Sequence, residues 1–335
     1  MSVTLTDEQA KNMASSLRNA ANVLDPPATT PTPPPTPIPP ATNYPNFQLI
    51  FDEQFTKDCA EGQALSVYGD RFFFYPATWD DTSNKGLYDP GIFSVSNGIA
   101  NIRMRTRDGR PRVCAPEPKI NGATADRNQL YGRYEVRFRA DSVDGYKTAF
   151  LLWPKSGVWP RDGEVDFPEG DLQGVIKAFM HRQNGTSGSD QDGYTSSARF
   201  PDWHTAVIEW KPNFCRFILD GNILGTSTSR VPNTPMHWVL QCETELNSTY
   251  PAPGAVANVA DRLCGYVEVC AVKRDSNGEA QDEDEIQTET WNPRSPAYQR
   301  RDNPDVLEEY VRLHEKAAKE AGLRSRTSEG RRLPG

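Results

Sequence analysis

Three carboxylates stand close together in the segment Glu164-Val165-Asp166-Phe167-Pro168-Glu169. In a β-strand, successive side chains alternate between two faces, so Glu164 and Asp166 share one face and Glu169 would lie on the other. One extra residue, a β-bulge between Asp166 and Glu169, returns Glu169 to the face of the other two acids. Pro168 favours a bulge here, because proline cannot donate a ladder hydrogen bond and is confined in sheets to edges, strand starts and bulges. The segment therefore predicts a strand that presents three acids on one surface.

Carboxyl groups packed this closely cannot all ionise freely, so one of them is expected to keep its proton near neutral pH beside an ionised partner. Retaining glycosidases use such a pair, with the two carboxyl groups about 5–5.5 Å apart, whereas inverting glycosidases hold theirs roughly 6.5–9.5 Å apart to admit a water molecule. The short spacing along one strand favours the retaining arrangement. Without its flanking residues, the triplet is equally compatible with a solvated acidic strand or a metal site.

A long pattern of residues surrounds the triplet. It comprises Tyr131-Gly132-Arg133-Tyr134-Glu135-Val136-Arg137, Trp153-Pro154, Trp159-Pro160 and Gly163 before the acids, and His181, Asp202-Trp203-His204, Glu209-Trp210 and Phe217-Ile218-Leu219-Asp220-Gly221 after them. This pattern resembles glycoside hydrolase family 16, whose members are retaining endo-β-glucanases and endo-β-galactanases with a β-jelly-roll fold. The resemblance extends roughly from Phe47 to Lys273.

The resemblance implies a role for each acid. Glu164 would be the nucleophile that forms a glycosyl-enzyme intermediate, and Glu169 the general acid that protonates the leaving oxygen and then deprotonates water. Asp166 would hydrogen-bond Glu164 and tune the proton affinities of both neighbours. The resemblance also implies substrate-binding residues, with Trp159 and His181 in the cleavage subsite and weaker candidates elsewhere: Trp153, Gln241, Trp203 and Trp210. Because aromatic side chains dominate cores as well as binding surfaces, Trp203 and Trp210 are more often core residues than sugar platforms.

Two residues depart from the family pattern. Phe51 stands where many members have Trp, before Asp52-Glu53, and Pro168 replaces the usual aliphatic bulge residue. Neither change removes a catalytic group, but both bear on substrate identity, since family members cut β-1,3-glucan, mixed-linkage glucan, agar, carrageenan or xyloglucan. The laminarinase-like branch is the nearest. The resemblance thus implies endo-hydrolysis of a β-linked polysaccharide, either a β-1,3-glucan-like polymer or a bacterial surface glycan.

Two alternatives to an enzyme remain: a non-catalytic glycan-binding module, and a structural virion protein on the same fold. The intact acid triplet favours an enzyme, because clustered carboxylates cost electrostatic energy that a binding module has no reason to bear. No cofactor is expected, and no Cys-x-x-Cys or His-Glu-x-x-His metal pattern occurs in the sequence.

Alternating apolar and polar residues predict an all-β fold independently of the triplet. Three runs show this alternation: Tyr134, Val136 and Phe138; Ala100, Ile102 and Met104, which follow an Asn97-Gly98 turn typical of a hairpin; and Met236, Trp238 and Leu240. Together with the resemblance, they predict a concanavalin-like β-jelly-roll sandwich of half-buried strands. On the polar side of the last run, Gln241 and Glu243 would face either the cleft or solvent.

The N-terminal part of the chain differs in composition from the rest. Residues 1–25 predict a short amphipathic helix, with Thr6 and Gln9 at capping-box spacing, suited to anchoring or oligomerisation. Ten of the twenty residues from Pro26 to Pro45 are proline, a composition typical of a stiff polyproline II spacer with a rise of about 3.1 Å per residue. The alternative for the first segment is a frayed, disordered end.

The jelly roll is expected over residues 46–275, followed by an extension over residues 276–335. A helix is predicted at about 304–321, because Asn303 can cap it and Gly322 can end it, and the Arg-rich tail beyond it is predicted to be disordered.

Charge and hydropathy limit the partners of the protein. The net charge is −8 and the sequence pI is about 5.2, so nonspecific binding to nucleic acid is not expected. No apolar run approaches the ~20 residues of a membrane span, and the first residues lack the basic and apolar regions of a secretory signal. An extracellular glycan substrate then requires either a signal absent from this sequence or release by cell lysis. We favour the second as a hypothesis, in which the predicted N-terminal helix attaches the enzyme to phage tail or other virion proteins.

The sequence contains six cysteines, namely Cys59, Cys114, Cys215, Cys242, Cys264 and Cys270. Six cysteines allow fifteen pairings, which sequence alone does not resolve. A pair of Cys264 with Cys270 is disfavoured: on one extended strand their Cα atoms would lie about 20 Å apart, beyond the roughly 7 Å that a disulfide spans.

Overall fold

The computed structural model describes residues 43–44, 47–120, 127–247 and 249–272, with side chains placed within residues 47–258. All of them fall in one compact unit. The predicted helix at 1–25, nearly all of the linker at 26–45 and the predicted helix at 304–321 lie outside the described residues.

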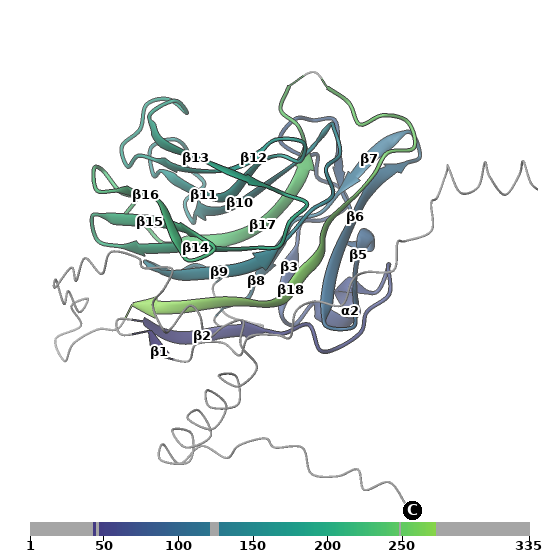
Figure 1. Cartoon of the computed structure of the whole chain (residues 1–335), viewed down its shortest axis with the longest axis horizontal. Helices are drawn as coiled ribbons and strands as arrows, with labels where there is room; N and C mark the ends of the chain where they lie inside the picture. Colours follow the sequence, from purple (N-terminus) through teal and green to yellow (C-terminus); the bar gives the residue numbers. More distant parts are fainter. Residues whose placement is uncertain (1–42, 45–46, 121–126, 248, 273–335) are drawn as a thin grey trace, which may run out of the picture. The chain divides into compact units, whose positions relative to one another are not determined.

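A five-stranded antiparallel sheet carries the site (Figure 1). Its strand order is β13-β12-β11-β10-β17. The bounds are β10 (Tyr146–Pro154), β11 (Glu164–Asp171), β12 (Val175–His181), β13 (Gln191–Arg199) and β17 (Met236–Thr244). Strand β11, which begins at the first acid of the triplet, therefore lies in the middle of this sheet.

An 11-stranded sheet forms the second layer, with the main order β16-β15-β14-β9-β18-β6-β7-β4 and with β1, β2 and β5 pairing beside it. Its strands are β1 (Asn43–Tyr44), β2 (Phe47–Glu53), β4 (Leu87–Tyr88), β5 (Phe93–Ser96), β6 (Ile99–Arg107), β7 (Arg110–Val113), β9 (Gly132–Phe138), β14 (His204–Lys211), β15 (Phe214–Leu219), β16 (Asn222–Ser227) and β18 (Val256–Val272). A two-stranded sheet pairs β3 (Phe72–Phe74) with β8 (Pro116–Pro118), and the described helices are α2 (Ala64–Tyr68) and the 3-10 helix η1 (Pro90–Ile92).

Side chains from the two large sheets meet in a shared core. Tyr134 of β9 contacts Trp238 of β17 with ring centroids 5.5 Å apart, and Phe138 of β9 contacts Phe150 of β10 at 6.2 Å. The alternating pattern assigned Tyr134, Phe138 and Trp238 to buried faces, and all three are almost fully buried. The predicted all-β sandwich is confirmed.

The Asn97-Gly98 turn forms as predicted. Both residues have positive φ, 54° and 74°, which is the backbone conformation of a two-residue hairpin turn and which Asn and Gly tolerate best. Ser96 of β5 pairs with Ile99 of β6 directly across it.

Four of the six cysteines have described side chains, and none of these four forms a disulfide. Cys59, Cys114, Cys215 and Cys242 are buried free thiols. Cys264 and Cys270 both lie on β18, as the argument against their pairing assumed, where they stand opposite Arg137 of β9 and Leu49 of β2 respectively. Within the part of the chain that the structure describes, no helix has the length and apolar character needed to span a membrane.

Candidate active site

The predicted bulge is present in β11. Against β12, Asp166 pairs with Phe179 and Glu169 pairs with Lys177, so three steps along β11 match two steps along its neighbour. The same mismatch appears on the other side, where Asp166 and Glu169 pair with residues of β10 only two positions apart, Leu151 and Ala149. One extra residue therefore restores the side-chain parity, and Glu169 shares a face with Glu164 and Asp166.

The residues between the acids point into the core. Val165 and Phe167 are fully buried, and the Phe167 ring meets Phe217 of β15 in the opposite sheet with centroids 5.5 Å apart. Packing of Phe167 between the sheets holds this part of the strand against the core, because a buried aromatic ring contributes a large apolar contact area.

A cleft of about 950 Å³ lies over this face of the sheet. It is lined by all three acids and by four of the residues predicted to bind substrate, Trp153, Trp159, His181 and Gln241. Trp159 is 40% exposed, and its ring stands edge-on to the His181 imidazole with centroids 5.7 Å apart. The cleft thus contains predicted residues from four strands, β10, β11, β12 and β17, and Trp159 from the loop between β10 and β11.

Two predicted substrate-binding residues lie elsewhere. Trp210 of β14 is fully buried, where its indole N–H donates to the Pro232 carbonyl oxygen at 2.7 Å and its ring contacts Tyr131. Trp203 is half-buried with the Arg137 guanidinium 5.4 Å from its ring centroid, and it does not line the cleft. Neither residue lines the cleft: Trp210 lies on β14, in the sheet behind the cleft floor, and Trp203 stands immediately before that strand.

Burial controls the proton affinity of the two inner acids. Glu164 and Asp166 are 8% and 3% exposed. Burial, followed by the charge of Asp166, raises the pKa of Glu164 well above its usual value, although His181 opposes the shift. Burial, followed by the charge of Glu169, likewise raises the pKa of Asp166. The pair therefore holds a proton more readily than exposed carboxyls would.

His181 is the imidazole closest to this pair. Its Nε2 lies 3.3 Å from Asp166 Oδ2 and 3.9 Å from Glu164 Oε2. Within the described residues, this trio is the group whose ligand atoms could hold a metal ion, because one atom of each lies within 4.8 Å of the others. A cation bound there would occupy the two inner carboxylates, so the arrangement fits either a metal or acid–base chemistry on those carboxylates, but not both at once.

Sequence reasoning missed a cation beside the third acid. Lys147 Nζ donates a 2.7 Å hydrogen bond to Glu169 Oε1 and lies 3.6 Å from Glu243 Oε1. Burial disfavours the charged ammonium, but Glu169 and Glu243 outweigh it and raise the pKa of Lys147. The available signal was a single charge within the otherwise uncharged strand Tyr146–Pro154. Glu243, one of the two cleft candidates of β17, does line the cleft.

An aromatic rim on the β17 side of the cleft was also missed. Trp79 is 49% exposed and lines the cleft together with Tyr75 and Tyr88. The Tyr75 ring contacts both of the others, with centroids 5.1 Å from Trp79 and 5.0 Å from Tyr88. Trp79 lies outside any strand, so side-chain periodicity gave no signal for its position.

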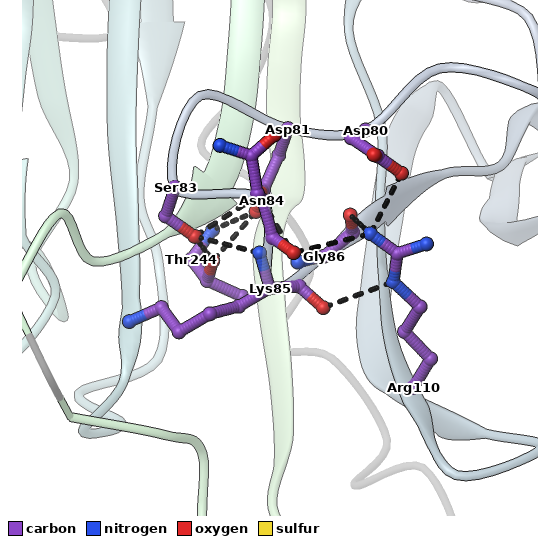
Figure 2. Close-up of polar contacts among 8 residues, drawn as sticks. All are labelled: Asp80, Asp81, Ser83, Asn84, Lys85, Gly86, Arg110 and Thr244. Atoms are coloured by element: carbon purple, nitrogen blue, oxygen red, sulfur yellow. Dashed lines mark hydrogen bonds and ion pairs between the residues drawn. The ribbon is translucent and has the colours of Figure 1, made fainter.

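Asp81 anchors the loop that follows Trp79 (Figure 2). Its buried carboxylate accepts hydrogen bonds from the backbone N–H of Gly86 and Thr244, both at 3.0 Å, from the Thr244 hydroxyl at 2.6 Å and from the Ser83 hydroxyl at 3.0 Å. Thr244 ends strand β17. A single carboxylate therefore ties the rim of the cleft to its floor.

Comparisons with known proteins agree with this geometry. The family model "Glycosyl hydrolases family 16" matches residues 92–242. A β-glucanase of Paenibacillus polymyxa is 24% identical over 173 residues, which cover 49% of this chain and 69% of the relative. A glucan endo-1,3-beta-glucosidase of Cryptopygus antarcticus is 26% identical over 185 residues, which cover 45% of this chain and 68% of the relative. The laminarinase structure from Rhodothermus marinus matches with a TM-score of 0.54 and 19% identity, over 69% of this chain and 100% of that one.

The structural likeness concerns the fold, and it agrees with the predicted jelly-roll sandwich. The matched residues 92–242 include the whole of β11 and its bulge. The family model and the curated relatives together support glycoside hydrolase family 16 for this chain, which is a glycoside hydrolase.

Proposed function

We propose that the protein is an endo-acting enzyme that cleaves a β-linked glucan with retention of configuration. The observation that carries the proposal is the bulge in β11, which gives Glu164, Asp166 and Glu169 a common face on the cleft. The glucan is supported by relatives whose names are β-glucanase and glucan endo-1,3-beta-glucosidase. A β-1,3-glucan-like polymer is our first choice of substrate, and a bacterial surface glycan is the second.

The acids have complementary roles in this reaction. Glu164 attacks the anomeric carbon while Glu169 gives its proton to the departing glycosidic oxygen, so a carbon–carboxylate bond forms as the glycosidic bond breaks. Water then attacks the same carbon, its proton passes to Glu169, and Glu164 leaves as a carboxylate. Asp166 shares a proton with Glu164 and so tunes when the nucleophile is ionised.

Aromatic and polar side chains along the cleft would hold the sugars. Trp159 and His181 lie on one side of β11, and Trp153 and Gln241 lie on the other side, on β10 and β17. An exposed indole face such as that of Trp159 offers a large apolar surface to a sugar ring, while amide and imidazole groups bond hydroxyls.

The main test is release of reducing sugar from β-1,3-glucan, mixed-linkage glucan, agar, carrageenan, xyloglucan and bacterial wall glycans. We expect activity on a β-glucan, loss of activity to the detection limit in Glu164→Gln, and a drop of about 10²–10⁴-fold in Glu169→Gln, the usual contribution of a general acid. NMR of the first product would show the β anomer. Release of the α anomer would refute retention, and undiminished activity in Glu164→Gln would refute its role as nucleophile.

Asp108→Asn is the matched control for these carboxyl-to-amide changes. Asp108 sits in a hairpin turn with φ of 52°, which Asn also tolerates, and its side chain is 90% exposed. We expect wild-type activity from this variant. If the wild type binds a glycan and cleaves none of the panel, a glycan-binding module would replace the proposal.

We also propose that residues 1–45 tether the enzyme to a larger assembly such as a phage tail. The support is the sequence alone, which combines an amphipathic N-terminal segment with ten prolines among residues 26–45. Deletion of residues 1–45 is expected to leave hydrolysis of soluble glucan unchanged. Immunogold electron microscopy of purified phage particles is the direct test, and absence of the protein from them would reject the tether to a virion.

A further inference from the structure

Lys147 is a buried cation on the floor of the cleft. It lies on β10, where its cross-strand neighbour on β17 is Glu243, and only 6% of its side chain is exposed. Among the described residues that line the cleft, it is the only Lys or Arg. Its ammonium donates to Glu169 at 2.7 Å and lies 3.6 Å from Glu243. One side chain thus connects an acid of the reaction to an acid outside it.

Glu243 gives the ammonium a fixed partner. It is 1% exposed, and its Oε2 accepts a 3.3 Å hydrogen bond from the backbone N–H of Thr82 in the loop anchored by Asp81. Glu243 therefore has little freedom to move, and Lys147 is held between it and Glu169. The Lys147 hydrogen bond in turn limits the orientations open to the Glu169 carboxylate.

Stability does not explain the burial of this cation. Buried ion pairs are often no more stabilising than apolar side chains of similar volume, because desolvation offsets the attraction between the charges. Loss of Lys147 alone is a different change, because it leaves Glu169 and the buried Glu243 without their cation, so its effect on the reaction must be measured apart from its effect on stability. We therefore look for the role of Lys147 in the reaction, in which its partner Glu169 takes part.

We propose that Lys147 is a positioning residue that holds Glu169 as an oriented carboxylate in the second half of the reaction. This inference rests on the proposed retaining mechanism. In the glycosyl-enzyme, Glu164 is esterified, and Glu169 must accept the proton of the attacking water as the bond from the sugar to Glu164 breaks. Lys147 keeps its own protons throughout, and its hydrogen bond is strongest while Glu169 is negatively charged.

Other charged groups surround Glu169, and they do not duplicate this role. Asp166 on β11 and Glu243 on β17 are acids, so neither supplies a positive charge to Glu169. Lys177 stands directly opposite Glu169 on β12, but it makes no ion pair within 4 Å among the described residues. His181, on the same strand, lies beside Glu164 and Asp166.

The test separates the two halves of the reaction with 2,4-dinitrophenyl β-laminaribioside. This leaving group needs no protonation, so kcat/KM reports formation of the glycosyl-enzyme and kcat reports its hydrolysis. In Lys147→Met we expect kcat and KM to fall together by about 10- to 100-fold, the effect of losing a hydrogen bond to a charged group, with kcat/KM nearly unchanged. Intact-protein mass spectrometry is expected to reveal accumulated glycosyl-enzyme.

Two further readouts distinguish positioning from a general structural role. Azide attacks the glycosyl-enzyme without needing a base, so added azide is expected to restore turnover of Lys147→Met but not to speed the wild type comparably. Lys147→Arg, which keeps the charge and the donor, is expected to rescue most of kcat.

Lys177→Met is the matched control, because it removes the same charge from the other neighbouring strand without breaking a contact to Glu169. We expect wild-type kinetics from it. Equal falls of kcat and kcat/KM in Lys147→Met, or the same behaviour in both Met variants, would overturn the inference. If Lys147→Met does not fold, Lys147→Gln takes its place in the same assay. A wild type that forms no glycosyl-enzyme on Glu164 would instead refute the proposed retaining mechanism.

Discussion

In the proposed mechanism Glu164 must be an anion, yet its surroundings favour the protonated form. Burial is the main reason, and the neighbouring charge of Asp166 adds to it. His181 opposes both from 3.9 Å. Glu164 is therefore expected to lose its proton at a higher pH than an exposed glutamate would. Because Glu164 and Asp166 influence each other, the acid limb of the pH–activity profile reports on both residues together.

The variant Asp166→Asn tests that balance. It removes the neighbouring charge but leaves the burial, so the pKa of Glu164 is expected to fall and the acid limb of kcat/KM to move to lower pH. The measurement is kcat/KM for the β-glucan across the acid range, with Asp108→Asn as the control. An acid limb that stays in place would mean that burial alone sets the ionisation of Glu164.

The same substitution is expected to stabilise the fold in a pH-dependent way. A carboxyl whose pKa is raised by folding contributes stability that is fully present below its unfolded value of about 4 and is lost as pH rises through the folded pKa. Burial raises the pKa of Asp166, so Asp166→Asn is expected to raise Tm more at pH 8 than at pH 5. Each kcal/mol corresponds to about 2–4 °C for a domain of this size. A difference in Tm that is constant between the two pH values, measured by calorimetry, contradicts this assignment.

At the scale of single residues, the sequence predicted the features that depend on the spacing of residues along one strand. The acids and the bulge follow from strand parity and from Pro168. Trp210, a weaker candidate that the family resemblance implied, lies in the core, because a Trp in a strand can serve the core as well as a binding surface. Lys147 was missed because its role depends on Glu169 and Glu243, which reach it only after three strands have paired.

At the scale of elements, the loop at residues 80–86 has no regular secondary structure and is held in place by side-chain hydrogen bonds. Asp81 supplies the acceptor for four hydrogen bonds, while Arg110 of β7 donates to the Asp80 carboxylate and to the Asn84 and Gly86 carbonyls from outside (Figure 2). This loop follows Trp79 directly and contacts the end of β17. No periodic pattern in the sequence predicts such a loop, because two of the hydrogen bonds that anchor Asp81 come from Thr244, more than 160 positions away.

Asp81→Ala is expected to loosen this rim. It leaves buried donors of Gly86 and Thr244 without an acceptor, at a cost of about 1–3 kcal/mol for each unsatisfied group. We expect a lower Tm and a higher KM for polymeric glucan with kcat largely retained, because Trp79 loses its support while the acids keep theirs. Asp80→Ala serves as the stability control, since its pair with Arg110 is partly exposed and such pairs contribute about 0–1 kcal/mol. Equal loss of Tm in both variants would argue against Asp81 as the anchor.

For the molecule as a whole, the two-layer core encloses the cysteines whose side chains are described, and they are free thiols. Cys114, Cys215 and Cys242 are fully buried, and burial raises the pKa of each thiol. Thiols that are both inaccessible and protonated react slowly, because the thiolate is the nucleophile.

Titration with a disulfide reagent is therefore expected to leave these three cysteines unmodified in the native protein and to modify them on unfolding. Peptide mass spectrometry after labelling at pH 8, with and without denaturant, makes the measurement site by site. Rapid labelling of Cys242 in the native state would show that the cleft-side sheet opens more readily than its packing indicates. Labelled Cys264 and Cys270 can be scored in the same spectra.

The bulge in β11 makes the chemistry of the cleft depend on a count of residues. Substitutions within Asp166–Glu169 alter packing or charge by degrees, but removal of one residue would turn Glu169 from the cleft to the opposite face of the sheet in a single step. The strand is thus tolerant of changed side chains and intolerant of changed length. Any redesign of this enzyme for another glycan can vary what lies along the cleft, provided that the number of residues between the acids is left alone.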